Sequence, residues 1–331
     1  MTNWLDAFQQ RHRWAGLPLA VLYKFFDDQA GYLTALITYY GFLSLFPLLL
    51  LLVTILGYSL QDDPVLQQQV LDSALSQFPV IGDQIGANIH SLHGSAPALV
   101  AGVLGSLFGG LGVVQAAQHA LNQVWGVPRN SRPNPIRARL RSLLLLAVGG
   151  TGIMATTALS AVNSTDGPYG SGVRVAAVAV ATALNVALFT FAFRVLTARP
   201  LTNRQVAGAA VTAAVVLQAL QWAGAFLIGH TLRGATATYG LFGVVLGLLA
   251  WIYLVALTFV VCAEINSVRL LRLWPRSLLT PFTDQVDLTA ADKRAYTSYA
   301  ETERHKGFER IDVDFTRSRP GREPPDPDAD T

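Results

Sequence analysis

The segment YLTALITYYGFLSLFPLLLLLVTILGY, residues 32–58, decides the fold, because it holds no Asp, Glu, Lys or Arg. A helix rises 1.5 Å per residue, so roughly 20 apolar residues cross a hydrocarbon core of about 30 Å. A barrel strand would alternate apolar and polar residues, whereas this stretch is apolar at nearly every position from Phe46 to Leu52. In lipid, only a helix satisfies its own backbone without neighbours. The segment is therefore a predicted transmembrane helix.

The rest of the chain contains five more long apolar stretches with few charges. Over its 331 residues the chain is 52% hydrophobic and 14% charged, whereas a soluble domain is about 25% charged. We therefore expect an all-α, polytopic membrane protein with about six transmembrane helices. The five further spans are predicted at 97–124, 142–163, 173–195, 206–229 and 239–263.

Basic residues fall on alternate connections between these spans, which predicts the orientation of the chain. The connection 59–96 has four aspartates and no Lys or Arg, whereas the connection after 97–124 carries five arginines and no acid. Positively charged short loops stay in the cytoplasm, so we expect both termini there (N-in/C-in). The same bias accounts for the basic pI of about 9.1. We therefore expect membrane lipids as partners and no nucleic acid.

Three regions follow from this pattern. Residues 1–31 are predicted to be a cytoplasmic arm and amphipathic lead-in, and 32–276 a six-span membrane domain. Its outer loop, 59–96, shows helical spacing of apolar residues, which predicts two amphipathic outer helices. Residues 277–331 are densely charged and rich in Pro at the end, which indicates a largely disordered cytoplasmic tail. A short helix is expected within 284–315.

Polar residues inside the predicted spans are candidates for a substrate path. One stripe with helical spacing lies at the end of the second span: Gln115, Gln118, His119 and Asn122. These residues, with Asn185 in the fourth span, are expected to line a hydrated vestibule or to form hydrogen bonds between helices. Glu264 is an isolated acid at the cytoplasmic end of the last span. Intramembrane acids are costly and mark functional sites, so Glu264 is interpreted either as a proton-coupling group or as the partner of a cytoplasmic arginine.

Two helix-distorting features accompany these polar groups. Pro47 removes a backbone hydrogen bond inside the first span and predicts a kink. Glycines recur in the second and last spans, where they favour close helix packing, with a hinge as the alternative.

Signatures of an enzyme are weak. His90 and His93 have the spacing of metal ligands, but no acid or cysteine partner is near them in the sequence. The sequence has no P-loop, nucleophile elbow or HExxH motif. The single cysteine, Cys262, is interpreted as a packing residue. No catalytic residue, metal or cofactor is predicted, and the chain is expected not to be an enzyme.

Over about residues 20–270, several short sequence motifs and their order along the chain resemble those of the YihY/BrkB family of bacterial inner-membrane proteins. The motifs are Ala35-Leu36-Ile37-Thr38-Tyr39-Tyr40, Ser44-Leu45-Phe46-Pro47, Ala120-Leu121-Asn122 with Trp125, Tyr239-Gly240-Leu241-Phe242-Gly243, Trp251-Ile252-Tyr253 and Ala263-Glu264-Ile265-Asn266. Ala207 departs from the Pro-Gly-Ala that is frequent in the family. The resemblance implies six spans and a plasma-membrane location. Members have been labelled ribonuclease BN, virulence factors or serum-resistance factors.

These observations lead to a functional hypothesis and two alternatives. The leading hypothesis is a transport or envelope-maintenance protein of the bacterial inner membrane that moves a lipid-like or amphipathic substrate. The first alternative is a membrane scaffold that binds envelope partners. A ribonuclease is less favoured, because the cytoplasmic loops offer arginines without a cluster of acid or base groups. The hypothesised cavity or path comprises Tyr39, Pro47, Gln115, Gln118, His119, Asn122, Asn185, Trp251, Tyr253, Glu264 and Asn266.

Overall fold

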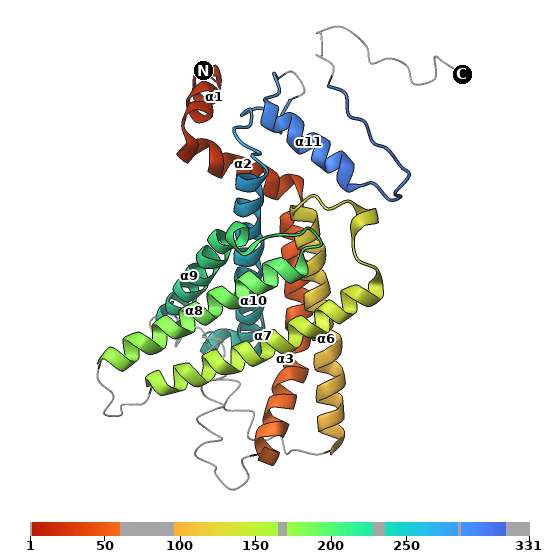
Figure 1. Cartoon of the computed structure of the whole chain (residues 1–331). Helices are drawn as coiled ribbons and strands as arrows, with labels where there is room; N and C mark the ends of the chain where they lie inside the picture. Colours follow the sequence, from red (N-terminus) through yellow and green to blue (C-terminus); the bar gives the residue numbers. More distant parts are fainter. Residues whose placement is uncertain (1, 60–95, 165–170, 228–235, 284–285, 316–331) are drawn as a thin grey trace.

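The computed structural model describes residues 2–59, 96–164, 171–227, 236–283 and 286–315 (Figure 1). In these residues the chain forms nine α-helices and one short 3₁₀ helix, and no strand. The helices are α1 (Thr2–Arg11), α2 (Arg13–Asp27), α3 (Ala30–Ser59), α6 (Ala96–Val124), α7 (Pro135–Ser164), α8 (Ser171–Leu196), α9 (Asn203–Leu227), α10 (Thr236–Leu270) and α11 (Ala290–Thr302), with the 3₁₀ helix at Arg129–Ser131.

Each of the six predicted spans coincides with one of the long helices, from α3 to α10. The prediction that these stretches are helical is confirmed. Within the described residues, three stretches are long and apolar enough to cross a membrane: Val175–Leu196, Asn203–Gly224 and Val245–Leu270. The two amphipathic helices predicted in the loop 59–96 fall outside the described residues.

Helices α3, α6 and α10 form the upright centre of the molecule, and α7 and α8 run obliquely beside them (Figure 1). Helix α3 packs on α6 and α10, while α9 packs on α8 and α10. The core between these helices uses small side chains, which let the backbones approach closely. Its fully buried members include Ala120 and Leu121 of α6, Ala210 of α9 and Val260 of α10. The rings of Phe193 and Phe259 stack with centroids 4.8 Å apart and join α8 to α10.

Glycines of α6 fit against α3 where no larger side chain fits. A Cβ atom built at Gly109 would lie 2.6 Å from the Cα atom of Ser44, and one at Gly105 would lie 2.8 Å from the ring of Pro47. The packing interpretation of these glycines is therefore confirmed. Helix α3 continues through Pro47, and the predicted kink there stays a prediction.

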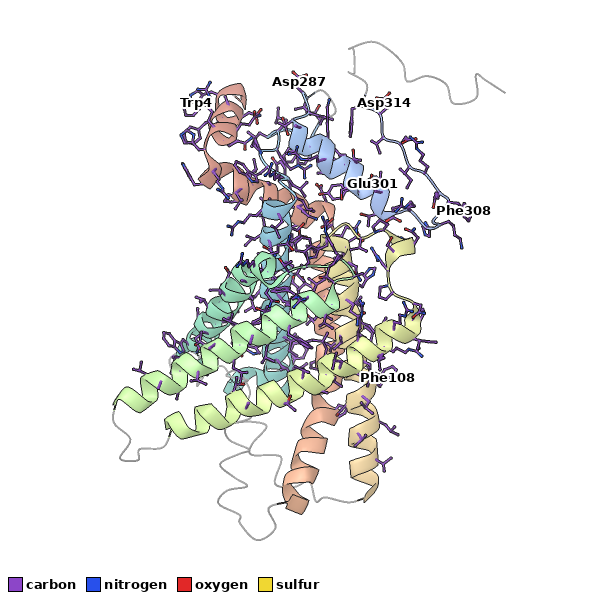
Figure 2. The ribbon with its side chains drawn as sticks, viewed as in Figure 1. Trp4, Phe108, Asp287, Glu301, Phe308 and Asp314 are labelled. Atoms are coloured by element: carbon purple, nitrogen blue, oxygen red, sulfur yellow. The ribbon has the colours of Figure 1, made fainter. Side chains whose placement is uncertain are left out.

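The N-terminal helices and α11 lie at the same end of the molecule (Figure 1). Figure 2 labels three charged residues at this end of the molecule: Asp287, Glu301 and Asp314. Trp4 lies at the same end. The helix expected within 284–315 is present as α11, which begins with a capping box between Thr289 and Asp292.

Within the predicted tail, α11 is the expected short helix, and the expectation of a largely disordered tail otherwise stays a prediction. Asp292 and Ala295 of this helix are buried. This part of a densely charged segment is ordered because Ala291, Asp292 and Ala295 lie together on the face that meets the body of the protein. Residues 316–331 lie outside the described residues.

Three connections that the arginine pattern assigned to one side of the membrane meet at this same end. The backbone N–H of Asn130, after α6, donates to the carbonyl of Arg304 at 3.1 Å. The N–H of Ala198, after α8, donates to Asn122 Oδ1 at 2.8 Å. Ser267 Oγ, near the end of α10, donates to the carbonyl of Val124 at 2.9 Å. The arginine-bearing connections are therefore neighbours in space as well as alike in charge.

Candidate functional site

Helix α2 lies across the end of α10 and buries a mostly apolar face against it. Ala20 of α2 and Val268 of α10 are both fully buried in the cluster between them, with Leu273. One turn after Ala20, the same face of α2 presents Lys24. The helix ends at Asp27 and is capped by Asp28, and the left-handed backbone of Gln29 turns the chain into α3. Local helix geometry thus brings an ammonium and a carboxylate into the joint between α2 and α10.

The joint contains a buried charge cluster made of Lys24, Asp28 and Glu264. The residues are 3%, 3% and 0% exposed. Lys24 Nζ donates to Asp28 Oδ2 and lies 3.5 Å from Glu264 Oε2. Two acids therefore converge on one ammonium. Buried ionic groups of this kind are stable only when they are paired and hydrogen-bonded.

Burial and charge act in opposite directions on the two cluster members that precede the first long helix. Burial alone would lower the pKa of Lys24, but the charges of Glu264 and Asp28 outweigh it and raise that pKa above its ordinary value. Burial raises the pKa of Asp28, and the adjacent ammonium only partly offsets this effect. The ammonium is thus held in its charged form, while the Asp28 carboxyl binds a proton more readily than an exposed aspartate.

A second ionic group, here called the latch, consists of Arg276, Asp27 and Asp292. Arg276 Nε donates to Asp292 Oδ1 at 2.9 Å, and its Nη1 donates to Asp27 Oδ2 at 2.7 Å. Burial would lower the pKa of Arg276, but the hydrogen bonds that it donates to Asp292 and Asp27 outweigh burial and raise that pKa. The other oxygen of Asp292 accepts from the backbone N–H groups of Ser277 and Thr289. The latch therefore ties α11 and the segment after α10 to α2.

Tyr299 of α11 stands between the latch and the buried charge cluster. Its hydroxyl donates to Asp27 Oδ2 at 3.1 Å, and Lys24 Nζ lies 5.7 Å from the centre of its ring. Burial raises the pKa of Tyr299, and the charges of Asp28 and Asp27 raise it further. The hydroxyl is thus kept as a donor, and its ring covers the cluster on the α11 side.

An apolar groove of about 400 Å³ lies beside the cluster, between α2 and α10. Its lining side chains are all aliphatic, aromatic or proline: Leu17, Pro18, Val21, Leu22, Phe25, Leu257, Val261 and Ile265. Ile265 follows Glu264 directly, and Phe25 follows Lys24. The apolar groove and the buried charge cluster are therefore two faces of the same helix joint.

The predicted polar stripe of α6 has structural partners. Gln118 donates to the hydroxyl of Ser142 at 2.9 Å and to the carbonyl of Ala138 on α7. Asn122 accepts from the backbone of Ala198. His119 is exposed, with its Nδ1 atom 3.3 Å from Arg132 Nη1, and Gln115 is exposed. Gln118 and Asn122 thus form hydrogen bonds between secondary-structure elements, which was the alternative to lining a hydrated vestibule.

The other predicted path residues are dispersed over α3, α8 and α10. Trp251 and Asn266 are buried, Tyr39 is exposed, and Asn185, Tyr253 and Pro47 are half-buried. Asn266 borders a hollow of about 10 Å³ that it shares with Arg269 and Gly208 of α9, space for about one water molecule. Neither this hollow nor the apolar groove is lined by the residues of the stripe.

Glu264 is the predicted site residue that the structure places in a chemically unusual setting. Its ion-pair partner is Lys24 of α2 rather than an arginine of a cytoplasmic loop. Sequence reasoning missed Lys24, Asp28 and the latch. A partial signal exists in the spacing of Lys24 and Asp28 by one helical turn on an amphipathic helix. The sequence has no comparable signal that pairs either of them with Glu264.

Within the described residues, no group of three or more His, Cys, Asp or Glu side chains is arranged to hold a metal ion. The chemistry that the cluster offers is proton binding and charge pairing by two carboxyls and an amine.

Comparison with known proteins identifies one family. A family model described as Virulence factor BrkB matches residues 21–276. This range begins inside α2 and ends at Arg276, so it includes the cluster, the groove residues from Val21 onward and the arginine of the latch. None of the curated proteins and none of the solved structures matches this chain.

Proposed function

Because the chain belongs to the virulence factor BrkB family, we propose that it is a multi-pass protein of the bacterial inner membrane with six spans and both termini in the cytoplasm. The six long helices support the span count. The gathering of arginine-bearing connections with α1, α2 and α11 at one end supports the orientation (Figure 1). Exposed aromatic side chains of the N-terminal helices, Trp4 and Trp14, suit a membrane–water interface.

We further propose a non-enzymatic role in moving a lipid-like or amphipathic substrate. The observation that carries this proposal is the apolar groove beside the buried charge cluster. An amphipathic molecule needs an apolar surface for its chain, and the groove between α2 and α10 supplies one, while the cluster lies buried in the same joint. Apolar surface contributes about 25 cal/mol per Å² removed from water, so the groove favours a hydrocarbon chain.

The direct test uses the full-length protein in liposomes that contain fluorescent phospholipids. We expect the protein to accelerate exchange of the labelled lipid between leaflets. Replacing Val261 in the groove with Trp should fill it and slow the exchange. The matched control is Val215→Trp on the exposed face of α9, which should leave the rate unchanged.

Two results would contradict the transport proposal. One is an exchange rate equal to that of protein-free liposomes. The other is equal exchange by Val261→Trp and the unmodified protein, because the groove would then take no part.

The scaffold hypothesis makes a different prediction for the tail. Phe308 is 91% exposed beyond α11, and such a side chain is available to a partner. Deleting 303–331 leaves the latch and α11 in place. A scaffold would then lose its partners, whereas a transporter would keep its exchange rate.

A further inference from the structure

The buried charge cluster has an uneven number of acids and bases. On α2 it contains Lys24 and Asp28, and on α10 it contains Glu264. If both carboxyls were ionised, the site would carry one net negative charge with almost no contact with water. Two carboxyl groups that share one site cannot both ionise without a large electrostatic cost.

The neighbouring charged groups do not correct this imbalance. The guanidinium of Arg276 is committed to Asp27 and Asp292. Tyr299 faces the cluster from α11, but its hydroxyl donates to Asp27. Lys24 is thus the cation that both carboxyls share.

The carboxyl oxygens give an independent indication. Asp28 Oδ1 and both carboxyl oxygens of Glu264 are buried without a hydrogen-bond partner among the described residues. All three atoms are acceptors when the carboxyls are ionised, so none of them can satisfy another. A proton on one carboxyl turns one acceptor into a donor and removes the net charge at the same time.

We propose that Lys24, Asp28 and Glu264 form a proton-binding site in which the two carboxyls hold one proton between them at neutral pH. Loss of this proton leaves an uncompensated negative charge in the joint between α2 and α10. The joint is then less favourable, and α2 separates from α10 more readily. Because the apolar groove belongs to the same joint, proton binding regulates access to the groove; this consequence rests on the proposed transport function, whereas the proton site does not.

The test is infrared difference spectroscopy of the full-length protein in liposomes during a pH titration. A protonated carboxyl gives a C=O stretching band that shifts in D₂O. We expect such a band at neutral pH, and we expect it to disappear in Asp28→Asn and in Glu264→Gln. Each variant leaves one carboxylate and one ammonium, which form an ion pair without a bound proton, so each is expected to fold.

The matched control is Glu303→Gln, which removes an exposed carboxylate paired with Arg129 and should leave the band unchanged. The proposal is overturned if the unmodified protein has no such band at neutral pH, or if the band survives in both variants. A band without lipid exchange would reject the transport function and retain the proton site.

Discussion

Lys24 Nζ and Glu264 Oε2 lie 3.5 Å apart in a joint where the two side chains are 4% and 0% exposed. This ion pair connects the helix that precedes the first long helix to the last one. Its members come from opposite ends of the matched family region. The pair therefore closes the bundle, and the charge balance around it should govern how firmly α2 is held.

Removing the ammonium should be far more harmful than removing either acid. In Lys24→Met the two carboxyls lose their shared cation, and we expect a loss of about 3–5 kcal/mol in the free energy of unfolding. Adding Glu264→Gln to Lys24→Met should cost less than the sum of the single changes. Unfolding in detergent measures these effects, with exposed Lys306→Met as the control. A Lys24→Met variant as stable as its parent would disprove the pairing.

Stability should fall as pH rises above the ordinary range of aspartate. The pKa of Asp28 is raised from 3.8 by burial, despite the charge of Lys24. The stability that this shift contributes is full below pH 3.8 and is lost as pH rises through the raised value. The midpoint of thermal unfolding, compared between the unmodified protein and Asp28→Asn, should show this component only in the former. Equal pH profiles for the two proteins would argue against it.

The ammonium of Lys24 adds a second component of stability, and this component is also lost as pH rises, in the alkaline range. The pKa of Lys24 is raised above 10.5, because the charges of Glu264 and Asp28 outweigh burial. Its contribution is full below pH 10.5 and is lost as pH rises through the higher folded value. The Lys24 ammonium should therefore lose its proton at lower pH in Glu264→Gln, which removes one of the two charges that raise its pKa.

A single methyl group in the seam between α3 and α6 should destabilise the protein. The added carbon of Gly109→Ala meets the backbone of Ser44, which cannot move aside like a flexible side chain. Overpacking of this kind costs about 1–3 kcal/mol. Gly149→Ala on α7 is the matched control, because a Cβ there meets nothing within 4 Å. Equal midpoints of unfolding for the two variants would contradict the close approach of α3 and α6.

The latch should require the planar guanidinium group of Arg276, which donates to two carboxylates at once. Arg276→Lys can keep only part of the geometry that pairs Asp27 and Asp292 at once. We expect a loss of about 2 kcal/mol and faster hydrogen exchange in α11. Arg310→Lys is the control, since its pair with Asp312 is exposed and such pairs contribute little. Unchanged exchange in α11 would show that the latch does not hold this helix.

The predicted orientation has a test based on single cysteines. Cys262 is the sole cysteine of the chain, so a Cys262→Ser background allows a new one to be placed. A membrane-impermeant thiol reagent applied to spheroplasts should label a cysteine at Gly94 and not one at Ser131. Permeabilisation should expose Ser131. The opposite pattern would reverse the orientation.

Particular residues show how much of the fold and of the candidate site the sequence alone can predict. Runs such as Leu48–Leu52 predict helices because a lipid environment leaves the backbone few alternatives. Glu264 was identified because one acid at the end of an apolar run is costly wherever it lies. The stripe from Gln115 to Asn122 was recognised correctly as polar, but its spacing alone did not distinguish a vestibule from hydrogen bonds to Ser142 and Ala198.

The sequence by itself determined that the chain is helical, where its long helices lie, and which connections are alike in charge, because these properties depend on local runs of residues. Only the tertiary structure decided that Lys24 and Asp28 meet Glu264, that Arg276 joins Asp27 to Asp292, and which face of α11 is buried. The physical reason is that a buried charge selects its partner by proximity in three dimensions. The face that α2 turns toward α10 depends on the packing of the whole bundle and not on either segment alone.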